Sequence, residues 1–192
     1  MIGLESSAPT FDHPLEMLLA CHGKILRQCD TLQKLMAHLR THGCDDQVRQ
    51  AAQGVLRYFS TAGQFHHQDE EENLFPALRA NNGDDPEQLD ALLQRLLQEH
   101  VVMLAAWNEL RPVLLQLAEG MNARLDEGLA NRFINSYTMH IAVENSELLP
   151  LAARLLTPEQ LRQVGMRMAE RRGASFPAST DRSSGTPDRP MK

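Results

Sequence analysis

Apolar residues recur along the first part of the chain at alternating spacings of four and three. The series begins at Leu18 and continues through Ile25 and Cys29 to Leu39. Such spacing keeps one face of an α-helix apolar and is typical of a helix packed in a bundle. His22 falls in the same series, so the pattern predicts an imidazole among core side chains.

Two further series predict a second and a third long helix. The second series runs from Val48 to His66, and we expect this helix to end near Leu78, before a turn-rich stretch. The third helix opens with a capping residue followed by a proline in its first turn. It carries His100 on its apolar face, where the spacing calls for a core residue.

A fourth helix follows a connection that we place at residues 120–124. It carries Leu129, His140, Glu144 and Leu151 on its inward face. Because the connections between successive long helices are short, we expect an all-α fold built as an up-down-up-down antiparallel four-helix bundle.

The two ends of the chain differ from this core. A capping-box pattern at residues 157–160 predicts the start of a short fifth helix. The residues after that helix are rich in Ser, Thr, Pro and Gly, a composition that predicts a disordered tail. The predicted division is a flexible N-terminus at 1–11, the bundle at 12–156, the short helix at 157–172 and the disordered tail at 173–192.

Composition narrows the function classes. At 192 residues the chain is long enough for one well-buried domain and too short for a second of ordinary size. A formal charge of -6 argues against a nucleic-acid surface built on phosphate contacts. We find no signal-peptide pattern and no bilayer-spanning apolar stretch, and therefore expect a cytoplasmic protein without a membrane anchor. The sequence has no CxxC pair, and we interpret its cysteines as reduced, small apolar residues: Cys21, Cys29 and Cys44.

One short motif occurs twice in the sequence. In each copy a Glu follows a His by four residues, a Leu follows four residues later, and a Pro follows two residues after that. Residues four apart lie on the same face of a helix, so each copy points an imidazole and a carboxylate in one direction, as a metal site requires. The two copies are His66, Glu70, Leu74 and Pro76, and His140, Glu144, Leu148 and Pro150.

The four predicted helices bring these side chains to one depth. At about 1.5 Å per residue, the His and Glu positions of the antiparallel helices agree to within about a turn. A single His in such a series is more often a hydrogen-bonded core residue. Four of them beside two carboxylates favour a metal, because unpaired carboxylates in an apolar core cost several kcal/mol each. The predicted metal ligands are His22, His66, Glu70, His100, His140 and Glu144.

Four imidazoles and two carboxylates suit a pair of metal ions. Each ion would take two nitrogens. Each carboxylate would bridge the two ions by giving one oxygen to each. Mixed nitrogen and carboxylate ligation with open positions favours non-haem iron, so we expect two iron ions joined by an oxo or hydroxo bridge. Manganese is less favoured, and zinc and calcium prefer other ligand sets.

Residues close to these ligands have alternative interpretations. His67 and Glu71 form a second pair with the same spacing, rotated by about 100° from the first, and a metal contact by either stays open. Among the acidic residues 69–72, only Glu70 is expected to point inward. Tyr137 could donate a hydrogen bond to a bound oxygen species, although core packing is its simpler role.

Three other histidines belong to the first predicted helix or its start. His42 lies about 30 Å from His22 along a straight helix, so the two cannot bind one centre. His38 is similarly distant, and His13 is at the helix start. We expect all three to be surface or capping residues.

The ligand residues and motifs resemble the hemerythrin family, specifically its HHE cation-binding domain. The resemblance rests on His22, on HHQDEEENLFP at 66–76, on the pair Glu99-His100, and on HIAVENSELLP at 140–150. It covers residues 12 to 155 and implies a di-iron centre in a four-helix bundle that binds oxygen, nitric oxide or related small species. Family members carry oxygen, sense gases or iron, or aid the repair of oxidised iron-sulfur centres.

The chain departs from the oxygen-carrying hemerythrins at one position. Those proteins have a fifth His one helical turn from its partner on the third helix, but Leu96 and Leu104 stand four residues on either side of His100. The ligand set is more similar to the symmetric sites of the iron-centre repair proteins. This departure argues against reversible oxygen storage.

Three functions follow from the sequence. The first is a di-iron protein that binds oxygen, nitric oxide or peroxide as a sensor, a scavenger, or an iron donor and repair factor. The second is an oxidase or peroxidase that turns over substrate at the same centre. The third is a structural or partner-binding bundle in which the metal site has degenerated.

Overall fold

A computed structural model describes residues 10–81 and 85–176. Over these residues the regular structure is entirely helical, and no strand is present. The prediction of an all-α fold is therefore confirmed for the described part of the chain. The predicted flexible N-terminus at 1–11 and disordered tail at 173–192 fall largely outside the described residues, and the domain division stays a prediction.

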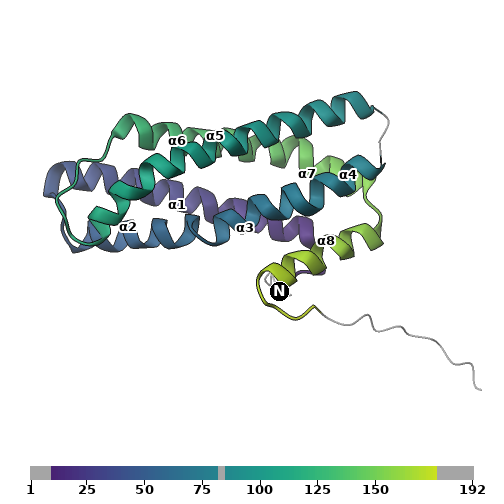
Figure 1. The fold of residues 1–192 in the computed structure, drawn as a ribbon, viewed down its shortest axis with the longest axis horizontal. Helices are drawn as coiled ribbons and strands as arrows, with labels where there is room; N and C mark the ends of the chain where they lie inside the picture. The colour runs from purple at the N-terminus through teal and green to yellow at the C-terminus, as the bar shows by residue number, and fades with distance from the viewer. Residues whose placement is uncertain (1–9, 82–84, 177–192) are drawn as a thin grey trace, which may run out of the picture.

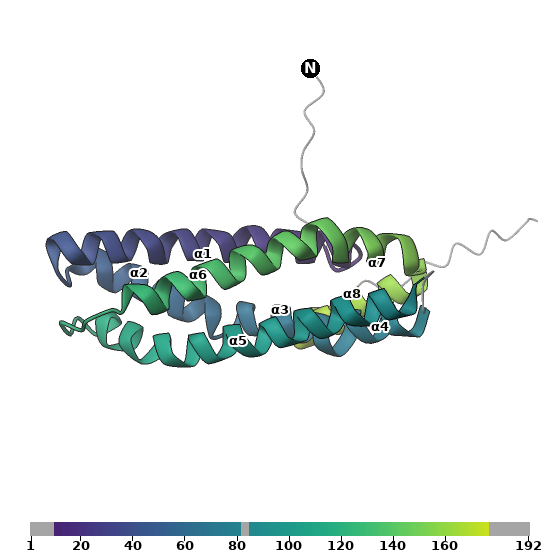
Figure 2. The same cartoon turned by 90° about the horizontal axis from the view of Figure 1, so that it is seen from above.

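Long helical rods lie side by side along the molecule (Figures 1 and 2). The first rod is α1 (Pro14–His42). The second is divided into α2 (Asp46–Phe59), α3 (Ala62–Asp69), the π-helix η1 (Glu70–Leu74) and α4 (Phe75–Asn81). The third is α5 (Pro86–Ala118), and the fourth consists of α6 (Glu127–Val143), the π-helix η2 (Glu144–Leu148) and α7 (Leu149–Leu155).

A last helix, α8 (Pro158–Arg171), packs against α1, α3 and η1 near one end of the rods (Figures 1 and 2). The predicted capping box is present, since the Thr157 hydroxyl accepts the backbone N–H of Gln160 and the Gln160 side chain accepts the backbone N–H of Thr157. This reciprocal pairing satisfies amide donors that have no partner inside the helix.

Aspartates cap three of the long helices. The side chains of Asp45, Asp85 and Asp126 accept backbone N–H groups in the first turns of α2, α5 and α6. A carboxylate at this position satisfies unpaired amides and interacts favourably with the positive end of the helix dipole.

The buried apolar residues form two clusters that flank the layer of predicted ligands. One cluster contains Ile25, Met103 and Tyr137, and the other contains Leu18, Leu96 and Leu148. Along each rod the predicted ligands fall between these clusters. The rods therefore hold a short polar layer inside an otherwise apolar core.

The second and fourth rods are less regular than the single long helices that the sequence predicts. The second rod is interrupted at Ser60 and Thr61, and the second and fourth rods each contain a π-turn, which begins at Glu70 and at Glu144. An extra residue per turn rotates everything that follows around the helix axis. As a result Ala152 is fully buried while Leu151, which we expected to point inward, is only half-buried.

Cys21, Cys29 and Cys44 are free thiols, as predicted. Within residues 10–81 and 85–176, no helix is both long enough and apolar enough to cross a membrane.

Candidate metal centre

The six predicted ligands are all buried inside the helical rods. His22 comes from α1, His100 from α5, and the other four come from the two motif copies on the second and fourth rods. Their relative exposures are His22 1%, His66 1%, Glu70 0%, His100 3%, His140 1% and Glu144 0%.

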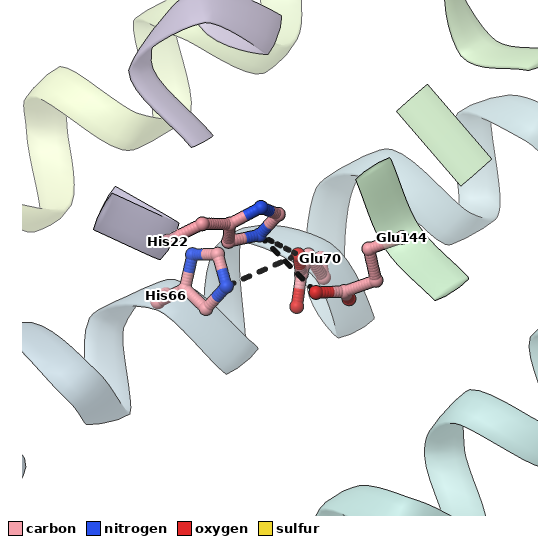
Figure 3. Close-up of side chains that lie close together, drawn as sticks. All are labelled: His22, His66, Glu70 and Glu144. Carbon is pink, nitrogen blue, oxygen red and sulfur yellow. Dashed lines mark ion pairs between the residues drawn. The ribbon is translucent and has the colours of Figure 1, made fainter. Parts of the chain in front are cut away.

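These residues form two sets of four, and the two sets share both glutamates. His22 and His66 complete the first set (Figure 3), and His100 and His140 complete the second. In each set the potential ligand atoms lie within 4.8 Å of one another. Two sets of donors that share two carboxylates have the arrangement expected for two cations bridged by those carboxylates.

Each shared carboxylate places one oxygen toward each set. Glu70 Oε1 lies 3.4 Å from His66 Nε2, and Glu70 Oε2 lies 3.5 Å from His100 Nε2. Glu144 Oε2 lies 3.1 Å from His22 Nε2, and Glu144 Oε1 lies 3.0 Å from His140 Nε2. The two carboxylates thus face both pairs of imidazoles.

The π-turns that begin at these glutamates have a cause in the sequence. In η1 the Phe75 N–H donates to the Glu70 carbonyl, and in η2 the Leu149 N–H donates to the Glu144 carbonyl. A proline follows each of these donors. Because proline lacks an N–H and its ring clashes with the carbonyl four residues earlier, a wider turn accommodates it without breaking the rod.

Three of the four imidazoles are held by a hydrogen bond from their outer nitrogen. His22 Nδ1 lies 2.6 Å from Asn145 Oδ1, His100 Nδ1 lies 2.6 Å from Glu71 Oε1, and His140 Nδ1 lies 2.8 Å from Glu99 Oε2. Oxygen acceptors at these positions assign the proton to Nδ1. Each Nε2 is then directed at the shared carboxylates, and when the ring is neutral its lone pair has the orientation that a metal ligand needs.

The second set shows most clearly that a positive charge is needed between the ligands. His100 Nε2 and His140 Nε2 lie 3.0 Å apart, and both rings already donate from Nδ1 to a carboxylate. Two lone pairs at this separation repel unless a proton or a metal ion lies between them. This nitrogen pair therefore fits a cation.

Several buried polar atoms in this layer have no hydrogen-bond partner within the described part of the chain. They are His22 Nε2, both ring nitrogens of His66, both carboxylate oxygens of Glu70 and both of Glu144. Leaving such atoms unsatisfied costs several kcal/mol each for charged groups, and a bound metal removes that cost.

The pKa values also reflect the crowding of charges in the metal-free chain. Burial raises the pKa of Glu70 well above its usual range, and the neighbouring Glu144 carboxylate adds to this effect. Burial opposes the charged form of His22, but the Glu144 and Glu70 carboxylates outweigh it and raise its pKa to about 10. Burial lowers the pKa of His66 to about 3. In the absence of metal, protons therefore balance part of the negative charge.

The interpretation of the acidic residues 69–72 needs a correction. We expected only Glu70 to point inward, but Asp69 is also fully buried. Its carboxylate pairs with Arg171 and Arg172 at the end of α8. An Asp without a local partner gives no sign of burial in the sequence, because its partners are about a hundred residues away along the chain.

His67 lies beside the layer, stacked on His100 at 3.9 Å between ring centroids and on Tyr137 at 5.7 Å. His67, Glu71 and His100 also form a third group of potential ligand atoms within 4.8 Å of one another. The alternative that His67 or Glu71 contacts metal thus keeps geometric support, although the Glu71 carboxylate is engaged with His100 Nδ1.

The remaining histidines lie away from the layer. His13 is the residue before the first turn of α1, and its side chain makes no capping hydrogen bond. His38 Nε2 lies 2.7 Å from the Asp45 carboxylate, and its ring stacks on His42 at 4.2 Å. None of these three belongs to a ligand set among the described residues, in agreement with the sequence analysis.

Sequence reasoning missed the residues that orient the imidazoles, namely Glu71, Glu99 and Asn145. A signal was present, because Glu71 and Asn145 each follow a shared glutamate and Glu99 precedes His100. A polar residue next to a buried ligand points partly toward the neighbouring rod, where it can reach an outer ring nitrogen.

Comparison with known proteins gives a family and a relative. The chain matches the hemerythrin HHE cation binding domain over residues 13–152. It is also similar to a protein of Haemophilus influenzae described as an uncharacterized protein, with 33% identity over 163 residues. That similarity covers 85% of this chain and 92% of the relative.

Proposed function

We propose, since the chain belongs to the hemerythrin family of HHE cation-binding domains, that its ligand layer binds two iron ions inside an antiparallel four-helix bundle. Membership in this family implies metal binding, and the number and identity of the ions are part of the proposal. One observation carries it above all others: two sets of four donors share the same two buried carboxylates.

The residues fit such a pair of ions on physical grounds. His22 and His66 would bind one ion, His100 and His140 would bind the other, and the two glutamates would bridge them. This assignment gives a partner to the buried oxygens and ring nitrogens that have no hydrogen bond. It also supplies the positive charge that the facing nitrogens of His100 and His140 require.

Iron fits the donor types better than the alternatives. Imidazole nitrogen mixed with carboxylate oxygen suits iron, and manganese is the second choice. Calcium prefers oxygen-only sets, and structural zinc sites are closed tetrahedra of four ligands. When bound, iron would supply affinity for oxygen, nitric oxide or peroxide and the ability to exchange electrons.

Residues around the ligand layer orient the imidazole rings and keep water away from them. Asn145, Glu71 and Glu99 fix three of the imidazoles, and the two apolar clusters close the layer on both sides. Such outer hydrogen bonds and an apolar surrounding tune metal affinity and access of solvent. These features suit the site to hold metal, as a sensor, a scavenger, or an iron donor and repair factor requires.

The first test is metal content per chain, measured by inductively coupled plasma mass spectrometry on protein from iron-replete cells. We expect about two irons per chain, as a bridged pair requires. The His66→Ala and Glu144→Ala variants should lose iron and change the visible spectrum. Full iron content and unchanged spectra in both variants would contradict the proposal.

The same preparation separates the other two functions. Sustained turnover of hydrogen peroxide with a reductant, lost in Glu70→Ala, would favour a di-iron oxidase or peroxidase. Stability that is indifferent to chelators would favour a structural or partner-binding bundle. The cytoplasmic location and the lack of a nucleic-acid partner stay predictions from composition.

A further inference from the structure

Helix α8 lies outside the region that matches the family, yet it packs next to the ligand layer. The matched region ends at residue 152, whereas α8 spans Pro158–Arg171. It contacts α1, α3 and η1, the elements that carry His22, His66 and Glu70. This contact raises the question of what an additional helix does there.

The end of α8 is joined to the ligand layer through ion pairs between two partly buried arginines and a buried carboxylate. Asp69, the residue before Glu70, is fully buried and pairs with Arg171 Nη1. Arg172 approaches the same carboxylate with both terminal nitrogens, at 2.6 Å and 3.2 Å. Charge-assisted hydrogen bonds to a buried carboxylate are short and directional, and salt screens partly buried pairs less than exposed ones.

Arg171 also contacts two residues within the π-turn that follow Glu70. Its Nη2 lies 2.7 Å from Glu72 Oε2 and 3.0 Å from Asn73 Oδ1. The two arginines thus contact three residues of the second rod, one before Glu70 and two after it. The backbone that carries Glu70 is therefore held on both sides.

The close docking of α8 depends on a glycine. A Cβ atom on Gly165 would lie 1.9 Å from the carbonyl oxygen of Phe11 and 3.3 Å from the Phe176 ring. Backbone cannot move aside as a flexible side chain can, so a larger residue would push α8 and the segment that carries Phe11 apart. This substitution therefore perturbs the docking of α8 without altering either arginine.

The other motif copy has no such attachment to any residue in the described ranges 10–81 and 85–176. The residue before Glu144 is Val143, which packs against apolar residues in place of an ion pair. The attachment is thus a property of the first copy alone and not a requirement of the repeated motif.

We propose that Arg171 and Arg172 are positioning residues, which hold η1 and its Glu70 in the ligand layer so that the docking of α8 controls the rate of metal release. The part of this inference that concerns metal rests on the proposed function. The part that concerns η1 can be tested without metal.

The first experiment measures amide hydrogen exchange in the metal-free chain. We compare wild type, the double variant Arg171→Gln with Arg172→Gln, and Gly165→Ala. The matched control is Arg167→Gln, which removes an exposed pair with Glu170 from the same helix. Amides of η1 should exchange faster in both test variants, on the order of tenfold, and at the wild-type rate in the control.

If the double variant fails to fold, Gly165→Ala still tests the proposal. Ala favours the helical state over Gly, so the variant perturbs the seat of α8 and not the helix itself. Unchanged exchange in η1 for either folded test variant, or an equal change in Arg167→Gln, would overturn the positioning role.

The second experiment measures iron release from loaded protein to a chelator. Arg171 and Arg172 contact neighbours of Glu70 and not Glu70 itself. We therefore expect faster release in both test variants, at the lower end of the roughly 10–100-fold loss that follows removal of a direct partner of a metal ligand. A lower urea midpoint with an unchanged release rate would mean that the arginines are structural only. If wild type binds no metal, the proposed function and the release step fail together, while the exchange experiment still decides whether α8 holds η1.

Discussion

The two halves of the ligand layer share their carboxylates but differ in what lies behind their imidazoles. His100 and His140 each donate to a carboxylate, at 2.6 Å and 2.8 Å. His22 donates to the neutral amide of Asn145 at 2.6 Å, and the outer nitrogen of His66 has no partner within the described residues. The repeated motif makes the inner ligands alike while the outer contacts remain unequal.

Because of this difference, we expect the two proposed metal positions not to be equivalent. A carboxylate that accepts a hydrogen bond from an imidazole fixes its orientation and makes its other nitrogen a stronger donor to a cation. An amide does this more weakly. We therefore expect the position between His100 and His140 to hold its ion more tightly than the position between His22 and His66.

The largest effect should come from a carboxylate that belongs to both halves. Glu144→Ala removes the oxygen that faces each position and the one negative charge that both positions share, so we expect iron content to fall from about two per chain to near zero. Glu147→Ala is the matched control, because Glu147 lies on the same π-turn and is exposed. Metal analysis of purified protein measures both variants.

Retention of one ion in Glu144→Ala would contradict a shared, bridging role for this carboxylate. It would indicate two independent sites that happen to be adjacent.

Removing one imidazole should act on one half more than on the other. His66→Ala deletes a ligand of the weaker position, so we expect about one iron to remain, between His100 and His140. His140→Ala deletes a ligand of the stronger position and should leave less than His66→Ala does. Equal residual content in the two variants would argue against unequal halves.

The inner ligands could be predicted from the sequence because their signal is local. A His and a Glu four residues apart share a helical face in any helix, and the two copies together with His22 and His100 define one layer. The structure buries all six residues and brings them together, and their role as metal ligands stays a proposal.

The outer contacts could not be predicted in the same way because they depend on pairing between distant segments. Asp69 is buried only because α8 returns to it. Leu151 and Ala152 exchange places because a π-turn shifts the register, and periodicity alone assumes a uniform helix. Prolines after both motif copies were the available sign of that irregularity.

Changing the charge behind the imidazoles should produce a smaller, graded effect. Glu99→Gln keeps an acceptor for His140 but removes the negative charge, and we expect a loss of iron affinity at the lower end of roughly 10–100-fold. Asn145→Asp adds the missing charge behind His22 and should strengthen the weaker position. Competition with a chelator, followed for each ion, measures the two affinities.

The pair of variants also tests the cause of the asymmetry. If Glu99→Gln and Asn145→Asp move the two affinities toward each other, charge behind the imidazoles explains the difference between the halves. Unchanged affinities in both variants would leave the missing partner of His66 as the remaining cause.

The mildest prediction concerns pH. In the metal-free chain the Glu144 and Glu70 carboxylates raise the pKa of His22 to about 10 against the opposing effect of burial, so this ring carries a proton at neutral pH. Metal must displace that proton, so affinity should increase as pH rises toward about 10, by up to about tenfold per pH unit for each proton released. The same linkage has the opposite sign for the metal-free fold, whose stabilisation by charged His22 is present at low pH and lost as pH rises through 10.

Titration calorimetry in buffers of different ionisation enthalpy counts the released protons, and His22→Gln should release at least one fewer than wild type. An equal proton count in the two proteins would mean that His22 is already neutral before metal binds. The protons released would then come from the Glu70 and Glu144 carboxyl groups and not from His22.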